Sequence, residues 1–156
     1  MSNKSYPVSI DIHQFSEKPY PYKCHATSIH LFISASSKIT IPMGKRSIEL
    51  PPQSVYLFYD QNRDFELLFN GPESSHLCIL ELSIYTLHTI LSNDTGELDF
   101  KQADIFNKEQ YHHFEPATVE IQNCVESLID NPYNTLLVES KKFEILYHYF
   151  SNRKVK

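Results

Sequence analysis

The sequence predicts an antiparallel β-barrel or β-sandwich followed by a helical pair, and three observations carry this prediction. Up to about residue 83 the apolar residues form short, β-branched, alternating runs, which is the pattern of half-buried strands. Beyond that point the apolar spacing lengthens to three and four residues, the period of amphipathic helices. No helix-length pattern separates the early runs, which argues against the crossover connections of a parallel sheet.

Six short runs are expected to be strands. Residues 55–59 are apolar on both faces, which predicts a central strand, whereas residues 29–34 alternate. Pro and Gly in residues 42–45 and 70–72 mark turns, and residues 60–64 form a polar connection. The expected strands cover residues 29–34, 39–41, 48–50, 55–59, 65–69 and 77–82.

Helices are expected in the second half of the chain. Ser83 is a candidate N-cap for a short helix that ends at residue 92. Pro116 suits the first position of the next helix, which Asn131 and Pro132 end. One apolar stripe marks that helix, at Ile121, Val125, Leu128 and Ile129. The last helix, from about residue 135, is apolar on more than one side and therefore needs two partners.

These patterns divide the chain into four parts. We expect a barrel with a short trailing helix at 1–92, a polar loop at 93–115, a helical hairpin at 116–150 and the start of a linker at 151–156.

Composition limits the function classes. The 156 residues carry 14 Lys and Arg against 19 Asp and Glu, and the net charge of −5 argues against binding to a nucleic-acid backbone. The three cysteines form no CxxC pair, which argues against a zinc knuckle and suits a reducing compartment. The N-terminus has no apolar signal region and no stretch is long enough to span a membrane, so we expect a cytoplasmic protein.

The chemical motifs of common enzyme sites are missing from the sequence. There is no His-x-His pair, and a regular strand would place His25 and His30 on opposite faces, so we expect no metal ligands. Glycine occurs only at positions 44, 71 and 96, too few for a P-loop or a dinucleotide fingerprint. We therefore expect no cofactor and no catalytic residues.

Aromatic side chains are the best candidates for ligand contacts. A barrel of this size holds either its own side chains or one small ligand, so these rings either fill the core or line a pocket. The candidate pocket residues are Phe32, Tyr56, Phe58, Tyr59 and Phe69.

The wide apolar surface of the last helix is the best candidate for self-association. This helix either packs on the barrel or forms a dimer seam, and its surplus apolar width favours the seam. The candidate interface residues are Phe143, Leu146, Tyr147 and Phe150.

One segment resembles a known family. Residues 128–132 read Leu-Ile-Asp-Asn-Pro, and the helix that follows carries Glu139, Lys141 and Glu144 ahead of Ile145-Leu146. This pattern resembles the N-terminal sensor half of AraC-type bacterial transcription regulators, in a siderophore-regulator-like branch. The resemblance implies a cupin-like β-barrel or jelly roll that senses a small-molecule effector and forms a homodimer. It also implies DNA binding through a C-terminal helix-turn-helix half, which we expect to lie outside this chain. The basic end of the chain suits the start of a linker to that half.

Two other interpretations remain open at this point. A stand-alone cupin-fold metalloenzyme, such as an isomerase or a dioxygenase, would need His-x-His with a Glu. A ligand-free assembly module would dimerise through its helices and have a fully packed barrel.

Overall fold

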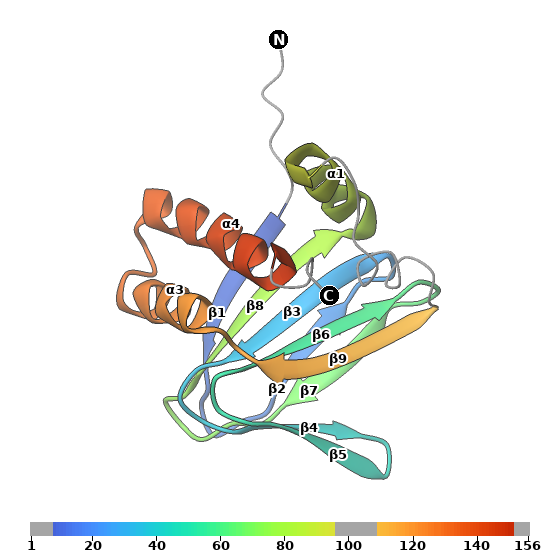
Figure 1. Cartoon of the computed structure of the whole chain (residues 1–156). Coiled ribbons are helices and arrows are strands. Elements are labelled where there is room, and N and C mark those ends of the chain that lie inside the picture. Colours follow the sequence, from blue (N-terminus) through green and yellow to red (C-terminus); the bar gives the residue numbers. More distant parts are fainter. Residues whose placement is uncertain (1–7, 96–108, 152–156) are drawn as a thin grey trace.

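The computed structural model describes residues 8–95 and 109–151, and these form three layers (Figure 1). The middle layer is an antiparallel sheet in the order β1 (Val8–Gln14), β8 (His76–Ser83), β3 (Ser28–Ser34), β6 (Ser54–Asp60) and β9 (Gln110–Pro116). On one face lie the pairs β2 (Tyr20–Cys24) with β7 (Phe65–Phe69) and β4 (Ile39–Met43) with β5 (Arg46–Leu50), which a bridge between Thr40 and Asn70 joins. The helices α1 (Ile84–Thr95), α3 (Val119–Asp130) and α4 (Thr135–Ser151) pack on the other side.

The expected class is therefore confirmed as an antiparallel β-sandwich with a helical pair. The central strands β8, β3 and β6 of the middle sheet are buried on both faces, and all seven residues of β6 are buried. This burial explains the continuous apolar run at 55–59, because alternation is lost when both faces of a strand are covered. Odd-numbered residues of β3 and β6, such as Leu31 and Leu57, pack toward the helices, whereas Phe32 and Tyr56 pack toward β2 and β7.

Three strands lie outside the expected set. β1 and β2 precede residue 29, and β9 occupies the end of the segment expected to be a polar loop at 93–115. β9 alternates exposed and half-buried residues, as an edge strand does, and its inward residues are polar or aromatic, so it shows no apolar alternation. At the other end of that segment α1 continues to Thr95; residues 96–108 lie outside the described part of the chain.

The helix boundaries follow from local capping. Pro116 ends β9 and does not open α3; Thr118 is the N-cap, and its hydroxyl accepts a hydrogen bond from the Ile121 amide at 3.2 Å. Ser83 caps α1 as expected, because its Oγ accepts from the Thr86 amide at 3.0 Å. The expected linker begins at Ser151, the last residue of α4, and its remaining residues lie outside the described part. None of the described helices combines the length and hydropathy that a membrane span requires.

Candidate functional site

A cluster of polar side chains lies at one end of the sandwich. Glu81 on β8 stands directly opposite His30 on β3, and both point between the two sheet layers. Tyr22 comes from β2, and His25 from the turn that connects β2 with β3. The segment from β2 to β3 and the distant strand β8 thus bring two imidazoles, a phenol and a carboxylate together. We call these four residues the Glu81 cluster.

Glu81 is the centre of this cluster. Its Oε2 lies 2.9 Å from His25 Nδ1 and 3.5 Å from His30 Nε2, and its Oε1 accepts a hydrogen bond from the Tyr22 hydroxyl at 2.9 Å. The His30 ring above all, together with His25 and Tyr22, holds the pKa of Glu81 at about 2. Glu81 is therefore ionised at neutral pH although its side chain is only 19% exposed.

His30 is the unusual member of the cluster. Its ring is fully buried, and neither ring nitrogen has a hydrogen-bond partner within the described residues, because 3.5 Å to Glu81 is too long for a well-formed bond. The ring is packed against Phe32 and Tyr22, with centroids 6.0 Å and 5.9 Å away. A buried polar group that makes no hydrogen bond costs free energy, so this arrangement needs a reason.

The expectation that His25 and His30 lie on opposite faces of a strand is wrong. That expectation assumed one regular strand, whereas β2 ends at Cys24 and β3 begins at Ser28. Thr27 has a φ of 66°, and the Ser28 amide donates to the His25 carbonyl at 3.1 Å, so the chain turns between the histidines. Neither Gly nor Pro marks this turn in the sequence. Glu81 reaches the cluster because β8 pairs with β3, and such pairing between distant strands cannot be predicted from the residues around Glu81.

Replacing Glu81 by Gln is expected to lower the free energy of unfolding at pH 7 by about 2–3 kcal/mol, because a pKa lowered from 4.5 to about 2 stabilises the folded state. This contribution is complete above pH 4.5 and disappears as the pH falls to about 2, since the folded-state pKa is the lower one. Urea unfolding of both proteins across this range measures it. A difference in stability that does not depend on pH would contradict the assignment.

Four of the five predicted pocket residues meet between the sheet layers. Phe32, Tyr56, Phe58 and Phe69 are fully buried in one cluster, and the ring of Phe32 lies 4.8 Å from that of Phe69 and 5.9 Å from that of Tyr56. The Tyr56 hydroxyl is hydrogen-bonded to His112 Nδ1 at 2.7 Å. Tyr59 belongs to the other cluster, on the helix side of the sheet, so it does not share a site with the other four. A ligand-lining role for the four rings stays a prediction.

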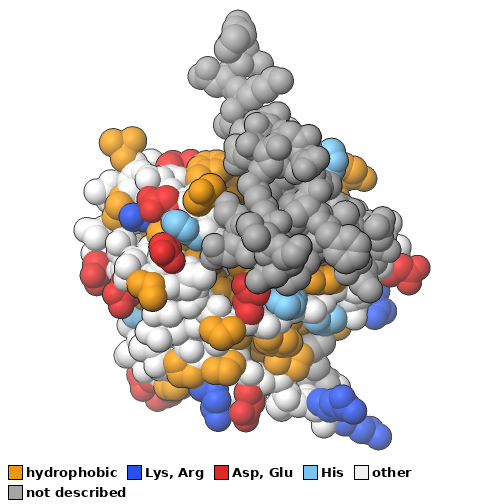
Figure 2. All heavy atoms as spheres, in the orientation of Figure 1, with side chains coloured by type: hydrophobic (Ala, Val, Ile, Leu, Met, Phe, Trp, Pro, Cys, Tyr) orange, Lys and Arg blue, Asp and Glu red, His pale blue; other side chains and the backbone are white. Residues whose placement is uncertain are grey.

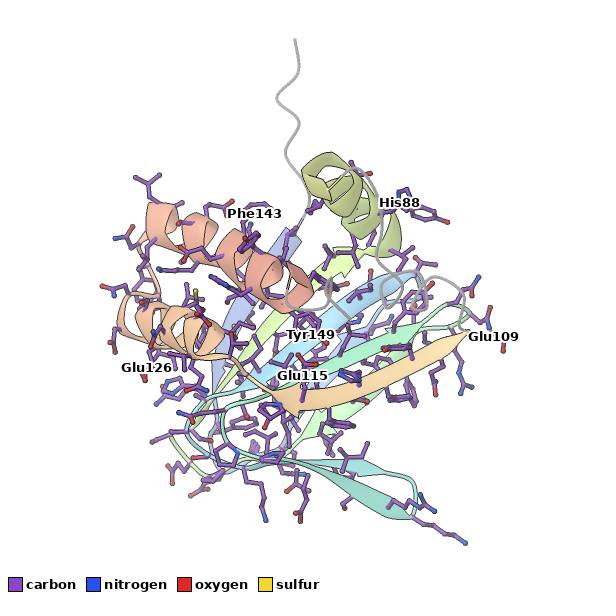
Figure 3. The ribbon with its side chains drawn as sticks, viewed as in Figure 1. His88, Glu109, Glu115, Glu126, Phe143 and Tyr149 are labelled. Carbon is purple, nitrogen blue, oxygen red and sulfur yellow. The ribbon has the colours of Figure 1, made fainter. Side chains whose placement is uncertain are left out.

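A cleft of about 230 Å³ opens between α3 and the opposite end of the middle sheet. His76, Gln53, Gln122 and Glu126 supply polar groups, and apolar side chains supply much of the remaining wall. Figure 3 shows Glu126 at the edge of α3. The full lining is Ile33, Ser34, Ala35, Ser36, Gln53, His76, Gln122, Val125, Glu126 and Ile129. The sequence does not reveal this cleft, because its residues come from four separate segments.

The predicted dimer residues fall on two faces of α4. Leu146 and Phe150 are 3% and 2% exposed and belong to the core beneath the helix, so the single chain already covers them. Phe143 and Tyr147 are 36% and 59% exposed, and Leu136, on the same side of the helix, is 84% exposed. Figure 3 shows Phe143 and the buried Tyr149 on different sides of α4. Apolar side chains are visible on the surface of this region in Figure 2.

The fold has clear counterparts among solved structures, although no protein-family model and no curated protein matches the sequence. A ligand-free lysine-to-alanine variant of ToxT from Vibrio cholerae superposes on 97% of this chain with a TM-score of 0.62 and 12% identity. Wild-type ToxT with a bound unsaturated fatty acid covers 99% of the chain with a TM-score of 0.56 and 13% identity. The chain spans 57% and 58% of those two ToxT chains.

ToxT is an AraC-family regulator, so the fold implied by the AraC-type resemblance is confirmed. At 12–13% identity this likeness establishes the fold of the chain, and it does not identify a ligand or a partner.

Proposed function

We propose that this chain is the effector-sensing and dimerisation domain of an AraC-type transcription regulator, that it is not an enzyme, and that DNA binding belongs to a helix-turn-helix segment outside it. The observation that carries the proposal is the fold shared with ToxT over 97% of the chain. Fold alone does not fix function, so the site and the coupling are argued from the residues of this chain.

The effector site that we propose is the cleft under α3. It combines apolar walls with a few convergent polar groups, as small-molecule sites do. Its volume of about 230 Å³ suits a small effector, or one end of a longer one. Because ToxT has been solved with an unsaturated fatty acid, an amphipathic carboxylate is the first class of effector to test.

The position of the cleft could couple ligand binding to dimerisation through α3 and α4. Val125 lines the cleft and also belongs to the core that α3 and α4 share above the sheet. On the far side of α3, Cys124 Sγ lies 3.7 Å from Glu144 Oε1 of α4. A ligand that binds one setting of α3 better than another would shift the population of settings, and α4 would follow.

The dimer seam that we propose is the exposed stripe Leu136, Phe143 and Tyr147 on α4. These residues are spaced i, i+7 and i+11, which places them on one side of a helix. Two copies of α4 related by a two-fold axis would bury both stripes, and two DNA-binding segments on one dimer would match two half-sites.

The proposal is tested with a fusion of residues 1–156 to a DNA-binding domain that represses a reporter only as a dimer. We expect repression, and we expect added oleate to change it. The variant Glu126→Trp, which fills the cleft, should abolish the oleate response, whereas Asn123→Trp, exposed on the same helix outside the cleft, should retain it. A fusion that stays monomeric and does not repress would overturn the dimerisation role. A Glu126→Trp variant that still responds fully would overturn the cleft.

A further inference from the structure

We propose that His25, His30 and Glu81 form a binding site for a divalent transition-metal ion, with Zn²⁺ as the reference ion. This reverses the sequence-based expectation of no metal. Two imidazole nitrogens and one carboxylate oxygen are a donor set that zinc uses in proteins, with a further position open for water or a ligand. The site is independent of the effector cleft: His76, at the cleft, and Glu81 are five residues apart on β8, about 17 Å at the usual rise of a strand.

The distances in the Glu81 cluster suit a shared ion. One ligand atom from each of the three residues lies within 4.8 Å of the other two. Tetrahedral zinc with bonds of about 2.0–2.2 Å separates its ligand atoms by about 3.4 Å. The separations from Glu81 Oε2, 2.9 Å to His25 Nδ1 and 3.5 Å to His30 Nε2, lie on either side of that value.

The burial of His30 is the second, independent observation. Its ring is completely buried, neither nitrogen makes a hydrogen bond among the described residues, and its Nε2 lies 3.5 Å from Glu81 Oε2. A metal bond to Nε2 satisfies that nitrogen and removes part of the cost of burying the ring.

The charge of the cluster also calls for a cation. Within the described residues, the ion-pair partners of the Glu81 carboxylate are the two histidines, with no Lys or Arg beside it. The Tyr22 hydroxyl donates to the other carboxylate oxygen and so orients Oε2 toward the imidazoles, as groups around metal ligands commonly do. The side chain of His25 is 54% exposed, which gives an ion access from solvent.

A bound ion would join the turn after β2 to β3 and β8, and so fasten the two sheet layers at this end of the sandwich. It therefore stabilises the folded chain, because the three ligands come together only there.

The test titrates the chelator-treated chain with Zn²⁺ by calorimetry and repeats the titration with Co²⁺ by visible absorption. We expect one equivalent of ion, a higher Tm, and a cobalt spectrum typical of nitrogen and oxygen ligands. His25→Ala and Glu81→Gln should each weaken binding at least tenfold. His113→Ala should leave it unchanged, because His113 contacts Glu115 at 2.8 Å without a third ligand within the described residues.

Three outcomes would overturn the proposal. They are the absence of stoichiometric binding to the folded parent chain, unchanged affinity in His25→Ala, and a thiolate-to-cobalt charge-transfer band, which would assign the ion to a cysteine such as Cys24. Because His25 is largely exposed, His25→Ala is expected to fold and keeps the test decisive even if Glu81→Gln does not.

Discussion

Leu146→Asp is expected to abolish folding, whereas Tyr147→Asp is expected to give a folded chain that no longer dimerises. Leu146 is 3% exposed in the core that α4 shares with the middle sheet, so the substitution would bury a carboxylate without a partner. That costs several kcal/mol, a large part of the about 5–15 kcal/mol that stabilises a typical domain. Tyr147 is 59% exposed on the proposed seam, where a carboxylate stays hydrated in the monomer and is desolvated only in a dimer.

Circular dichroism reports folding of the two variants, and analytical ultracentrifugation reports their association. Leu146→Ala serves as the graded control, with an expected loss of about 2–5 kcal/mol and unchanged association of the fraction that folds. A folded, monomeric Leu146→Asp protein would place Leu146 in the seam after all. A Tyr147→Asp protein that dimerises as tightly as the parent chain would exclude the exposed stripe on α4 as the dimer seam.

How far the sequence predicts this structure depends on whether each signal is local. The buried strand β6 and the amphipathic helix α3 were predictable because their apolar periods lie within one continuous segment. β9 was missed because an edge strand with residues such as His112 and Glu115 has no apolar alternation. Pro116 suited a helix start on general grounds, but the chain still pairs with β6 at that residue, and Thr118 makes the cap.

The candidate sites were harder to predict for the same reason. The four aromatic rings were identified by type, but the side of the sheet on which each lies depends on register, which separates Tyr59 from Phe58. The Glu81 cluster depends on the pairing of β3 with β8 and on a turn at Thr27 that no Gly or Pro announces. The width of α4 correctly indicated two partners, yet only burial shows that Leu146 faces the sheet and Tyr147 does not.

Truncating the aromatic core is the second change with a large expected effect. We expect Phe32→Ala to lower the free energy of unfolding by about 3–5 kcal/mol, as is usual for a buried phenylalanine. Phe32 is fully buried, and its ring lies 5.7 Å from that of Tyr22 and 4.8 Å from that of Phe69. Phe69→Ala should cost a similar amount. The loss of unfolding free energy in the double variant should differ from the sum of the two single losses, because the two rings are in contact and their removal leaves one shared cavity.

Urea unfolding measures all three variants, with Tyr85→Ala as the aromatic control. Tyr85 is 74% exposed on α1, so its loss should change stability by no more than about 0.5 kcal/mol. The same series distinguishes the two roles that the rings can have. If Phe32 and Phe69 are core residues, truncation lowers stability and leaves oleate binding to the folded fraction unchanged. If they line a ligand pocket, Phe32→Ala leaves stability nearly intact and weakens oleate binding, and that result would move the proposed effector site from the cleft under α3 to the interior of the sandwich.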